Sequence, residues 1–157
     1  MNDASLRQTL LSLFTSQKLA VLATYGEDQP YCSLMAFAVS DDLKHLIVAT
    51  KRHTQKFANI QKHPRISMLV DNRKNQVDDF QQAVAVTILA TAAEAAPTEH
   101  EKLRDLYLFK HPYMRSFCQS PDCVLLRLSV ERYLVVSSFR NYLASEDDYL
   151  EVRELRP

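Results

Sequence analysis

Short apolar runs that follow one another through tight turns are the feature that most limits the fold of this chain. Residues 19–25 and 31–40 are rich in strand-forming residues, and the turn chemistry of Gly26 to Pro30 separates them. Asp41 and Asp42 mark a second turn before a third apolar run at residues 46–49. Strands that are joined directly, rather than through helices, are typical of antiparallel sheets and barrels.

The remaining segments place helices around these strands. The spacing of apolar residues and caps predicts helices at residues 5–16 with Ser5 as cap, at residues 54–61, and from Thr98 onward with Glu101 in a capping box. Further strands are predicted at residues 66–70 and 83–93, with a loop at residues 71–82 between them, and residues 124–139 are predicted to form one long strand or two. We therefore expect a mainly β fold, an antiparallel barrel with peripheral helices, as a single domain over residues 1–157.

Composition limits the class of protein. A chain of 157 residues with 46% apolar content can build one core. Its 19 basic and 19 acidic side chains balance, so any electrostatic function must be local. Three cysteines without metal-type spacing predict reduced thiols and no metal site. Because the sequence has no apolar run of about 18 residues and no signal-like start, we expect a cytoplasmic protein without a membrane partner.

The single glycine, Gly26, excludes one way of binding phosphate. Both the dinucleotide-binding fingerprint and the Walker loop need several glycines so that the backbone can approach phosphate closely. Any phosphate that this chain binds must therefore be held by side chains and by the end of a helix.

Positive charge gathers in one part of the sequence, residues 43–70, which we call the basic window. It contains six Lys and Arg residues and no Asp or Glu. Its densest part is the Thr50–Lys56 segment, where a predicted strand gives way to a predicted helix. Cations in a first helical turn oppose the helix dipole, whereas a bound anion would reverse the balance. The segment is thus a candidate clamp for a monophosphate; the alternative is a solvated surface with Thr54 as a simple helix cap.

The stretch from Ala20 to Val70 resembles the pyridoxamine 5′-phosphate oxidase-like FMN-binding split-barrel superfamily. Residues 54–67, TQKFANIQKHPRIS, are similar to the family pattern of Ser or Thr, any residue, Lys, and an Asn-containing short helix that ends in Asn-Pro-Arg. The runs at residues 21–24 and 46–50 match the strands before it. Residues 86–92 resemble a later strand in which the family often has Gly at the position of Ala90.

The resemblance implies an antiparallel split β-barrel that forms a homodimer, with FMN in the groove between the subunits. Carried over residue by residue, it assigns phosphate binding to Thr54 and Lys56 and places Thr50 beside the phosphate. The backbone that would face the flavin ring belongs to Ser33, Leu34 and Met35.

The resemblance is incomplete at two phosphate-binding positions. Gln55 and Leu34 stand where the oxidase itself has arginine, a difference for which Lys51 and Arg52 could compensate. Asn72 and Arg73, just after the strand at residues 66–70, are further candidates. They would reach the carbonyl edge of the ring or the partner subunit, unless they belong to a plain surface loop.

An FMN site supplies hydride or electron transfer, so the expected function is that of a flavin-dependent oxidoreductase acting on an unidentified small molecule. No pyridoxal-phosphate residues are recognisable, so the oxidase activity itself is not expected. The alternatives are a non-catalytic, haem-binding or deazaflavin-binding split-barrel protein and, third, a nucleic-acid-binding module, for which aromatic residues are too few in the basic window. His53 is a further candidate for cofactor contact. The aromatic residues at positions 107–117 are either core or a lid over the flavin.

Overall fold

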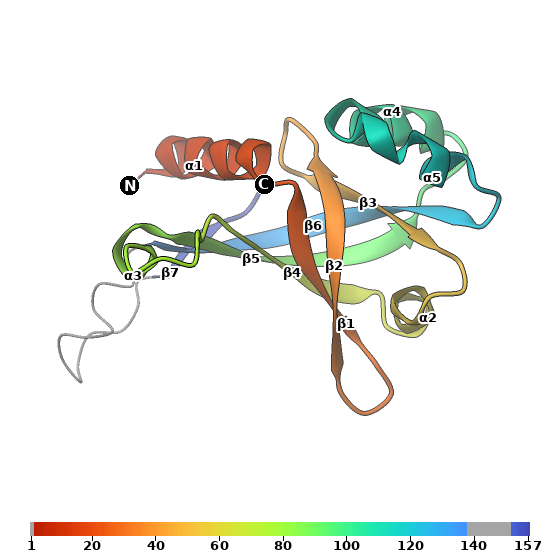
Figure 1. Cartoon of the computed structure of the whole chain (residues 1–157), viewed down its shortest axis with the longest axis horizontal. Helices are drawn as coiled ribbons and strands as arrows, with labels where there is room; N and C mark the ends of the chain where they lie inside the picture. The colour runs from red at the N-terminus through yellow and green to blue at the C-terminus, as the bar shows by residue number, and fades with distance from the viewer. Residues whose placement is uncertain (1, 138–151) are drawn as a thin grey trace.

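A computed structural model gives the structure of the chain, and it describes residues 2–137 and 152–157 (Figure 1). The strands are β1 (Leu19–Tyr25), β2 (Pro30–Val39), β3 (His45–Lys51), β4 (Arg65–Asp71), β5 (Val84–Glu94), β6 (Cys123–Ser137) and β7 (Val152–Leu155). The helices are α1 (Asp3–Ser16), α2 (Gln55–Lys62), α3 (Asp79–Gln82), α4 (His100–Lys110) and α5 (Arg115–Gln119), with a 3-10 turn, η1, at Pro112–Met114.

The strands form one antiparallel sheet that closes on itself. Its order is β3-β2-β1-β4-β5-β6-β7, and β3 also pairs with β6, so that β1 to β6 make a closed barrel. Strand β6 makes this closure possible because it is long enough to pair on both edges. Its residues Cys123 to Ser129 pair with β3, and residues 126–137 pair with β5. The predicted antiparallel barrel with flanking helices is confirmed.

The barrel interior and helix α1 share one hydrophobic core. Inward-facing residues alternate along the strands, as in the fully buried pair Leu22 and Phe37. Helix α1 adds an apolar face to the same cluster, consisting of Leu6, Leu10, Leu13 and Phe14. The Phe14 ring meets the edge of the Phe37 ring with centroids 5.9 Å apart. Helix α1 therefore closes one end of the barrel rather than packing on an outer face.

A second, smaller cluster covers the outside of β2, β3 and β6. It combines the outward-facing Ala38, Ile47 and Leu125 with Leu103 and Tyr107 of α4. Helices α4 and α5 lie together over this side of the barrel, away from α2 and from the protruding β1–β2 hairpin (Figure 1).

Several predicted boundaries change in the structure. Helix α1 begins at Asp3, because Asn2 rather than Ser5 is its cap and accepts a hydrogen bond from the Ser5 N–H. Helix α4 begins at His100 rather than Thr98, and no capping box forms there: the Glu99 carboxylate accepts from the Ala96 N–H instead. The predicted loop at residues 71–82 contains the short helix α3.

The last predicted strand is confirmed as β6 up to Ser137, and residues 138 and 139 lie outside the described residues. The final strand, β7, was not predicted. Among the described residues, no helix is both long and apolar enough to cross a membrane. The three cysteines carry free thiols, and no cluster of metal-ligating side chains occurs in residues 2–137 and 152–157.

Candidate functional site

The barrel wall opens between β2 and β3. These strands pair only at their far ends, where Phe37, Ala38 and Val39 face Val48, Ile47 and Leu46. From Pro30 to Ala36, β2 pairs with β1 along its other edge, and no described strand pairs with the edge that faces β3. The backbone of Ser33–Met35 therefore lies on an open strand edge, as the interpretation of the sequence requires. We call this opening the split.

Three segments that are separate in the sequence meet at the split. If the β2–β3 register is continued, Met35 faces Thr50 and Leu34 faces Lys51. The chain then turns and enters α2, which packs against β1 (Figure 1). The open edge of β2, the end of β3 and the start of α2 thus border one site.

The two threonines of the Thr50–Lys56 segment bind each other. Thr54 Oγ1 donates to the Lys51 carbonyl at 2.8 Å. This bond uses the only hydroxyl proton of Thr54. In the 3.1 Å contact between the two hydroxyls, Thr50 is therefore the donor and Thr54 the acceptor. Thr54 occupies the N-cap position of α2, yet its hydroxyl makes no capping bond, and the first turn of α2 contains no acidic residue. Among the residues that the structure describes, no side chain accepts from the first N–H groups of α2.

The charges of Lys51 and Arg52 are already paired within the chain. Lys51 Nζ donates to Asp122 Oδ1 at 2.8 Å and to Ser120 Oγ at 2.7 Å. The hydrogen bond from Lys51 is the largest cause, and that from Ser120 the next, of the lowering of the Asp122 pKa to about 2. Arg52 makes a two-pronged contact with the Glu94 carboxylate, at 2.7 and 3.3 Å. Neither cation is free to replace a missing phosphate-binding arginine unless its partner is displaced.

Lys56 differs from these neighbours. It is half-buried, and in the part of the chain that the structure describes it makes no ion pair. Gln55, beside it, donates from Nε2 to Asn59 Oδ1 at 2.8 Å, so its side chain is turned along the helix. Lys56 is therefore the one Lys or Arg of the segment without an ion-pair partner among residues 2–137 and 152–157.

Asn59 fixes α2 to the barrel. Its side chain is 4% exposed, and Nδ2 donates to Thr24 Oγ1 on β1 at 3.0 Å. The sequence interpretation gave Asn59 no role of its own. The signal was present, because Asn59 lies between the buried residues Phe57 and Ile60 on the apolar side of the helix.

Most of the positive charge of the basic window is neutralised in the folded chain. Four of its six cations pair with acids from outside the window: Lys51 with Asp122, Arg52 with Glu94, Lys62 with Glu27 and Arg65 with Glu131. Acids distant in sequence thus neutralise most of the charge that the sequence concentrates.

Asn72 and Arg73 lie at the opposite end of β4 from α2, about 20 Å away along the strand. Asn72 Oδ1 accepts from the Val84 N–H at 2.7 Å, and Arg73 Nε lies 3.1 Å from Asp71 Oδ1. Within one subunit they do not meet the Thr50–Lys56 segment.

The aromatic residues at positions 107–117 differ in exposure, and only the core role is confirmed for one of them. Tyr107 is core, 1% exposed, whereas Tyr113 is 63% exposed. His111 is fully buried and contacts the Phe37 carbonyl oxygen through Nε2 at 2.7 Å. Desolvation lowers the pKa of His111. His53 is exposed, with Nδ1 3.5 Å from Asp122 Oδ2.

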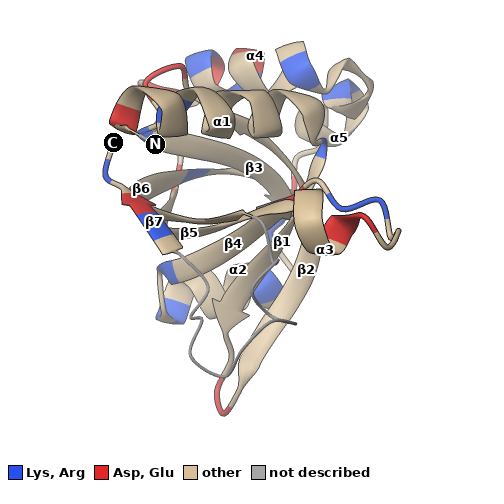
Figure 2. Cartoon of the chain, turned by 90° about the vertical axis from the view of Figure 1, so that its left-hand side faces the viewer, with Lys and Arg blue, Asp and Glu red and all other residues tan. Residues whose placement is uncertain are grey.

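The outer surface of β1 and β2, together with the middle of β4 around Leu69, is uncharged. Figure 2 shows the β1–β2 hairpin without charged residues along its strands, and acidic residues only at its tip. Val21 pairs with Leu34 on one side and Leu69 on the other, which gives a row of apolar side chains. Leu19, Leu34 and Leu69 are 50%, 67% and 37% exposed. We call this surface the outer hairpin face.

Comparisons with known proteins place this fold among solved structures. A heme-binding protein from Mycobacterium smegmatis has a TM-score of 0.79 at 15% identity, covering 99% of this chain and 58% of its own. General Stress Protein 26 from Bacillus anthracis has a TM-score of 0.67 at 19% identity, covering 97% and 98%. A FAD-binding protein from Mesorhizobium loti has a TM-score of 0.65 at 17% identity, covering 82% and 90%. This chain thus spans little more than half of the heme-binding protein.

At such identities these likenesses show a shared fold. No significant similarity to a curated protein sequence was found. A family model described as pyridoxamine 5′-phosphate oxidase matches residues 6–137, which include the whole split and all six barrel strands. The chain belongs to the pyridoxamine 5′-phosphate oxidase family.

Proposed function

We propose that this protein binds FMN at the split, with the phosphate against the first turn of α2 and Lys56. The observation that carries the proposal is the uncapped start of α2 beside a half-buried lysine that makes no ion pair with any described residue. Free N–H groups, the positive end of the helix dipole and an unpaired cation together suit a dianionic phosphate. The residues present therefore fit the phosphate, with Lys56 in the principal role and Lys51 and Arg52 held by acids.

The flavin ring would lie along the open edge of β2. The backbone of Ser33–Met35 offers unpaired groups there, and the exposed Leu34 side chain offers an apolar contact. Such an edge needs a cover, because exposed strand edges and apolar patches favour association. We propose that a second copy supplies it through the outer hairpin face, giving a homodimer with the cofactor between the subunits. Asn72 and Arg73 would then serve the site of the partner.

FMN, when bound, supplies hydride or electron transfer, and the proposed activity is that of an oxidoreductase acting on a small molecule. The residues of this chain would bind and orient. Lys56 and α2 would fix the phosphate end, and the buried Asn59–Thr24 bond would hold α2 against the barrel. The dimer interface would exclude water from the ring.

Fluorescence titration of FMN into the purified protein tests the proposal. We expect saturable binding that Lys56→Ala weakens about tenfold or more, because a charge-assisted bond to phosphate is lost. Lys62→Ala is the matched control, since Lys62 is on the same helix but pairs with Glu27. No binding by the wild-type protein, or equal losses in the two variants, would contradict the proposed site.

Haem is the second candidate. His53 is 77% exposed at the border of the split, so its imidazole is accessible as an axial ligand, and the structurally similar protein from M. smegmatis is described as heme-binding. The absorbance spectrum after addition of hemin distinguishes the two. A sharp Soret band, shifted from that of free hemin, that His53→Ala removes would favour haem over FMN. In the protein as purified, a flavin-like spectrum with fluorescence unlike that of FMN would indicate a deazaflavin.

A further inference from the structure

Two of the three cysteines lie together where α5 gives way to β6. Cys118 belongs to α5 and Cys123 is the first residue of β6, and both pack on the outer cluster that contains Tyr107 and Leu125. A hydrogen bond joins the two thiols, with Cys123 as the donor. Both residues are only partly buried, so a small reagent can reach them.

The short loop between the two cysteines is shaped by backbone hydrogen bonds. The Ser120 N–H donates to the Phe117 carbonyl at 3.3 Å, and the Cys123 N–H donates to the Ser120 carbonyl at 3.0 Å. These two bonds turn the chain back on itself within residues 117–123. A disulfide requires Cα atoms within about 7 Å and Cβ atoms that face each other, and two thiols in hydrogen-bonding contact come close to that arrangement.

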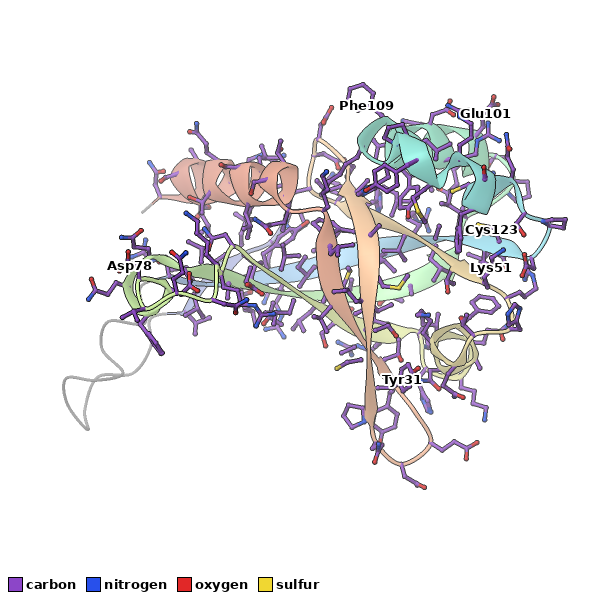
Figure 3. The ribbon with its side chains drawn as sticks, viewed as in Figure 1. Tyr31, Lys51, Asp78, Glu101, Phe109 and Cys123 are labelled. Atoms are coloured by element: carbon purple, nitrogen blue, oxygen red, sulfur yellow. The ribbon has the colours of Figure 1, made fainter. Side chains whose placement is uncertain are left out.

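The same loop is fastened to the end of β3. Lys51 Nζ donates to Ser120 Oγ and to Asp122 Oδ1. The Arg52 N–H donates to the Asp122 carbonyl at 2.8 Å. Because Lys51 and Cys123 are paired between β3 and β6, these contacts lie directly beside the thiols (Figure 3). The loop therefore holds its position without a covalent link between the two sulfurs.

The two thiols differ in how easily they ionise. Burial is the main cause that raises the pKa of Cys123 to about 11, and its neighbour Cys118 adds to that rise. Burial also raises the pKa of Cys118, whereas the hydrogen bond from Cys123 and the charge of Arg104 act in the opposite direction. The thiolate is the reactive form of cysteine, so Cys118 is the thiol that reacts first.

We propose that Cys118 and Cys123 form a redox-active dithiol, which low-molecular-weight disulfides oxidise to an intramolecular disulfide. The Cys118 thiolate attacks one sulfur of the small disulfide, forms a mixed disulfide with it and releases the other half as a thiolate. The Cys123 sulfur, after loss of its proton, attacks the Cys118 sulfur and displaces the second half. The small disulfide takes up two electrons, and the two protons of the protein thiols end on the two small thiols that leave. This reaction does not rest on the proposed binding of FMN.

Intact-mass spectrometry after exposure to excess glutathione disulfide tests the proposal. Cys32→Ser is the parent variant, because Cys32 is exposed on β2 and would take up glutathione by itself. We expect its main product to be lighter by two hydrogen atoms, to carry no glutathione, and to regain its original mass with dithiothreitol. Adding Cys123→Ser should trap one glutathione at Cys118, because no thiol remains to complete the second step. Adding Cys118→Ser should also prevent the loss of two hydrogens.

A peptide map of the wild-type protein gives the same test without substitutions. Residues 116–127 contain both cysteines and no Lys or Arg before Arg127, so trypsin releases them as one peptide. After oxidation this peptide should be lighter by two hydrogens and should not react with iodoacetamide.

Four results would overturn the proposal. They are thiols in Cys32→Ser that do not react, glutathione bound to Cys32→Ser in place of the internal disulfide, a covalent dimer linked through Cys118 or Cys123, and a loss of two hydrogens that persists when either of these cysteines is replaced.

Discussion

Asn59 on α2 donates from its buried side-chain amide to the hydroxyl of Thr24 on β1, across 3.0 Å. This bond joins the helix that borders the split to the barrel wall. Because Gln55 donates to Asn59 Oδ1 from one turn earlier, the start of α2 is tied to the same point. Placement of the candidate phosphate site thus depends in part on this buried polar contact between α2 and β1.

Asn59→Ala should lower the free energy of unfolding by about 1–3 kcal/mol, because it removes two hydrogen bonds and leaves the Thr24 hydroxyl without its donor. Urea unfolding measures the change. Gln61→Ala is the control, since Gln61 is exposed on the same helix. Equal stability of the two variants would show that the side-chain bonds of Asn59 do not help to hold α2 against the barrel.

Tyr133→Phe should destabilise the protein by about 1–2 kcal/mol. The hydroxyl of Tyr133, a fully buried residue, donates to the Leu43 carbonyl at 2.6 Å. Leu43 has a φ of 63°, a conformation unfavourable for leucine, and the bond helps to hold that turn. Thermal or urea unfolding measures the loss, and Tyr31→Phe, at an exposed position, should change little. A neutral result at position 133 would mean that water or another donor satisfies Leu43.

Asp122 should make stability depend on pH in the acid range. Its pKa is lowered from 3.8 to about 2, so its ionised form stabilises the folded state. That contribution is fully present above pH 4 and is lost as the pH falls through about 2. The difference in urea midpoint between wild type and Asp122→Asn should therefore be constant near neutrality and decrease toward pH 2. Asp28→Asn, at the exposed hairpin tip, serves as control; a difference that does not depend on pH would contradict the role of the carboxylate.

Leu34→Glu should separate the proposed dimer. It places a charge in the uncharged outer hairpin face at a position that is 67% exposed in the single chain, so the monomer should stay folded. Light scattering should then show half the wild-type mass. Phe109→Glu changes an even more exposed apolar residue on α4 and should remain dimeric. A monomeric wild type, or a dimeric Leu34→Glu, would exclude this interface.

The strands of the barrel and their order along the chain were predictable because period-2 patterning and turn residues are local signals. Residues 19–25 and 31–40 and the turn between them appear almost unchanged as β1 and β2. The closure of the barrel by β3 and β6 was harder to predict from the sequence. It pairs Lys51 with Cys123, which are far apart in the sequence but neighbours in the structure (Figure 3). Helix α4 begins later than predicted because Glu99, rather than Thr98, provides the polar contact near its start.

The site was predictable only in outline. The sequence predicts a candidate site at the start of α2, and in the structure Ser33–Met35 lie on the open edge of β2, Thr50 lies near the end of β3 and Lys56 lies in the first turn of α2. Which cations of the segment are paired could not be predicted from the sequence, because Asp122 and Glu94, the partners of Lys51 and Arg52, belong to distant segments. Local charge in a sequence does not reveal its partners in space.

The most direct test of the central claim is a comparison of FMN with riboflavin, which lacks the phosphate, by calorimetry on wild type and Lys56→Ala. The proposed site predicts that wild type prefers FMN over riboflavin by tenfold or more, that Lys56→Ala abolishes most of this preference, and that riboflavin affinity stays nearly the same. An undiminished preference for FMN in Lys56→Ala would contradict the placement of the phosphate at α2.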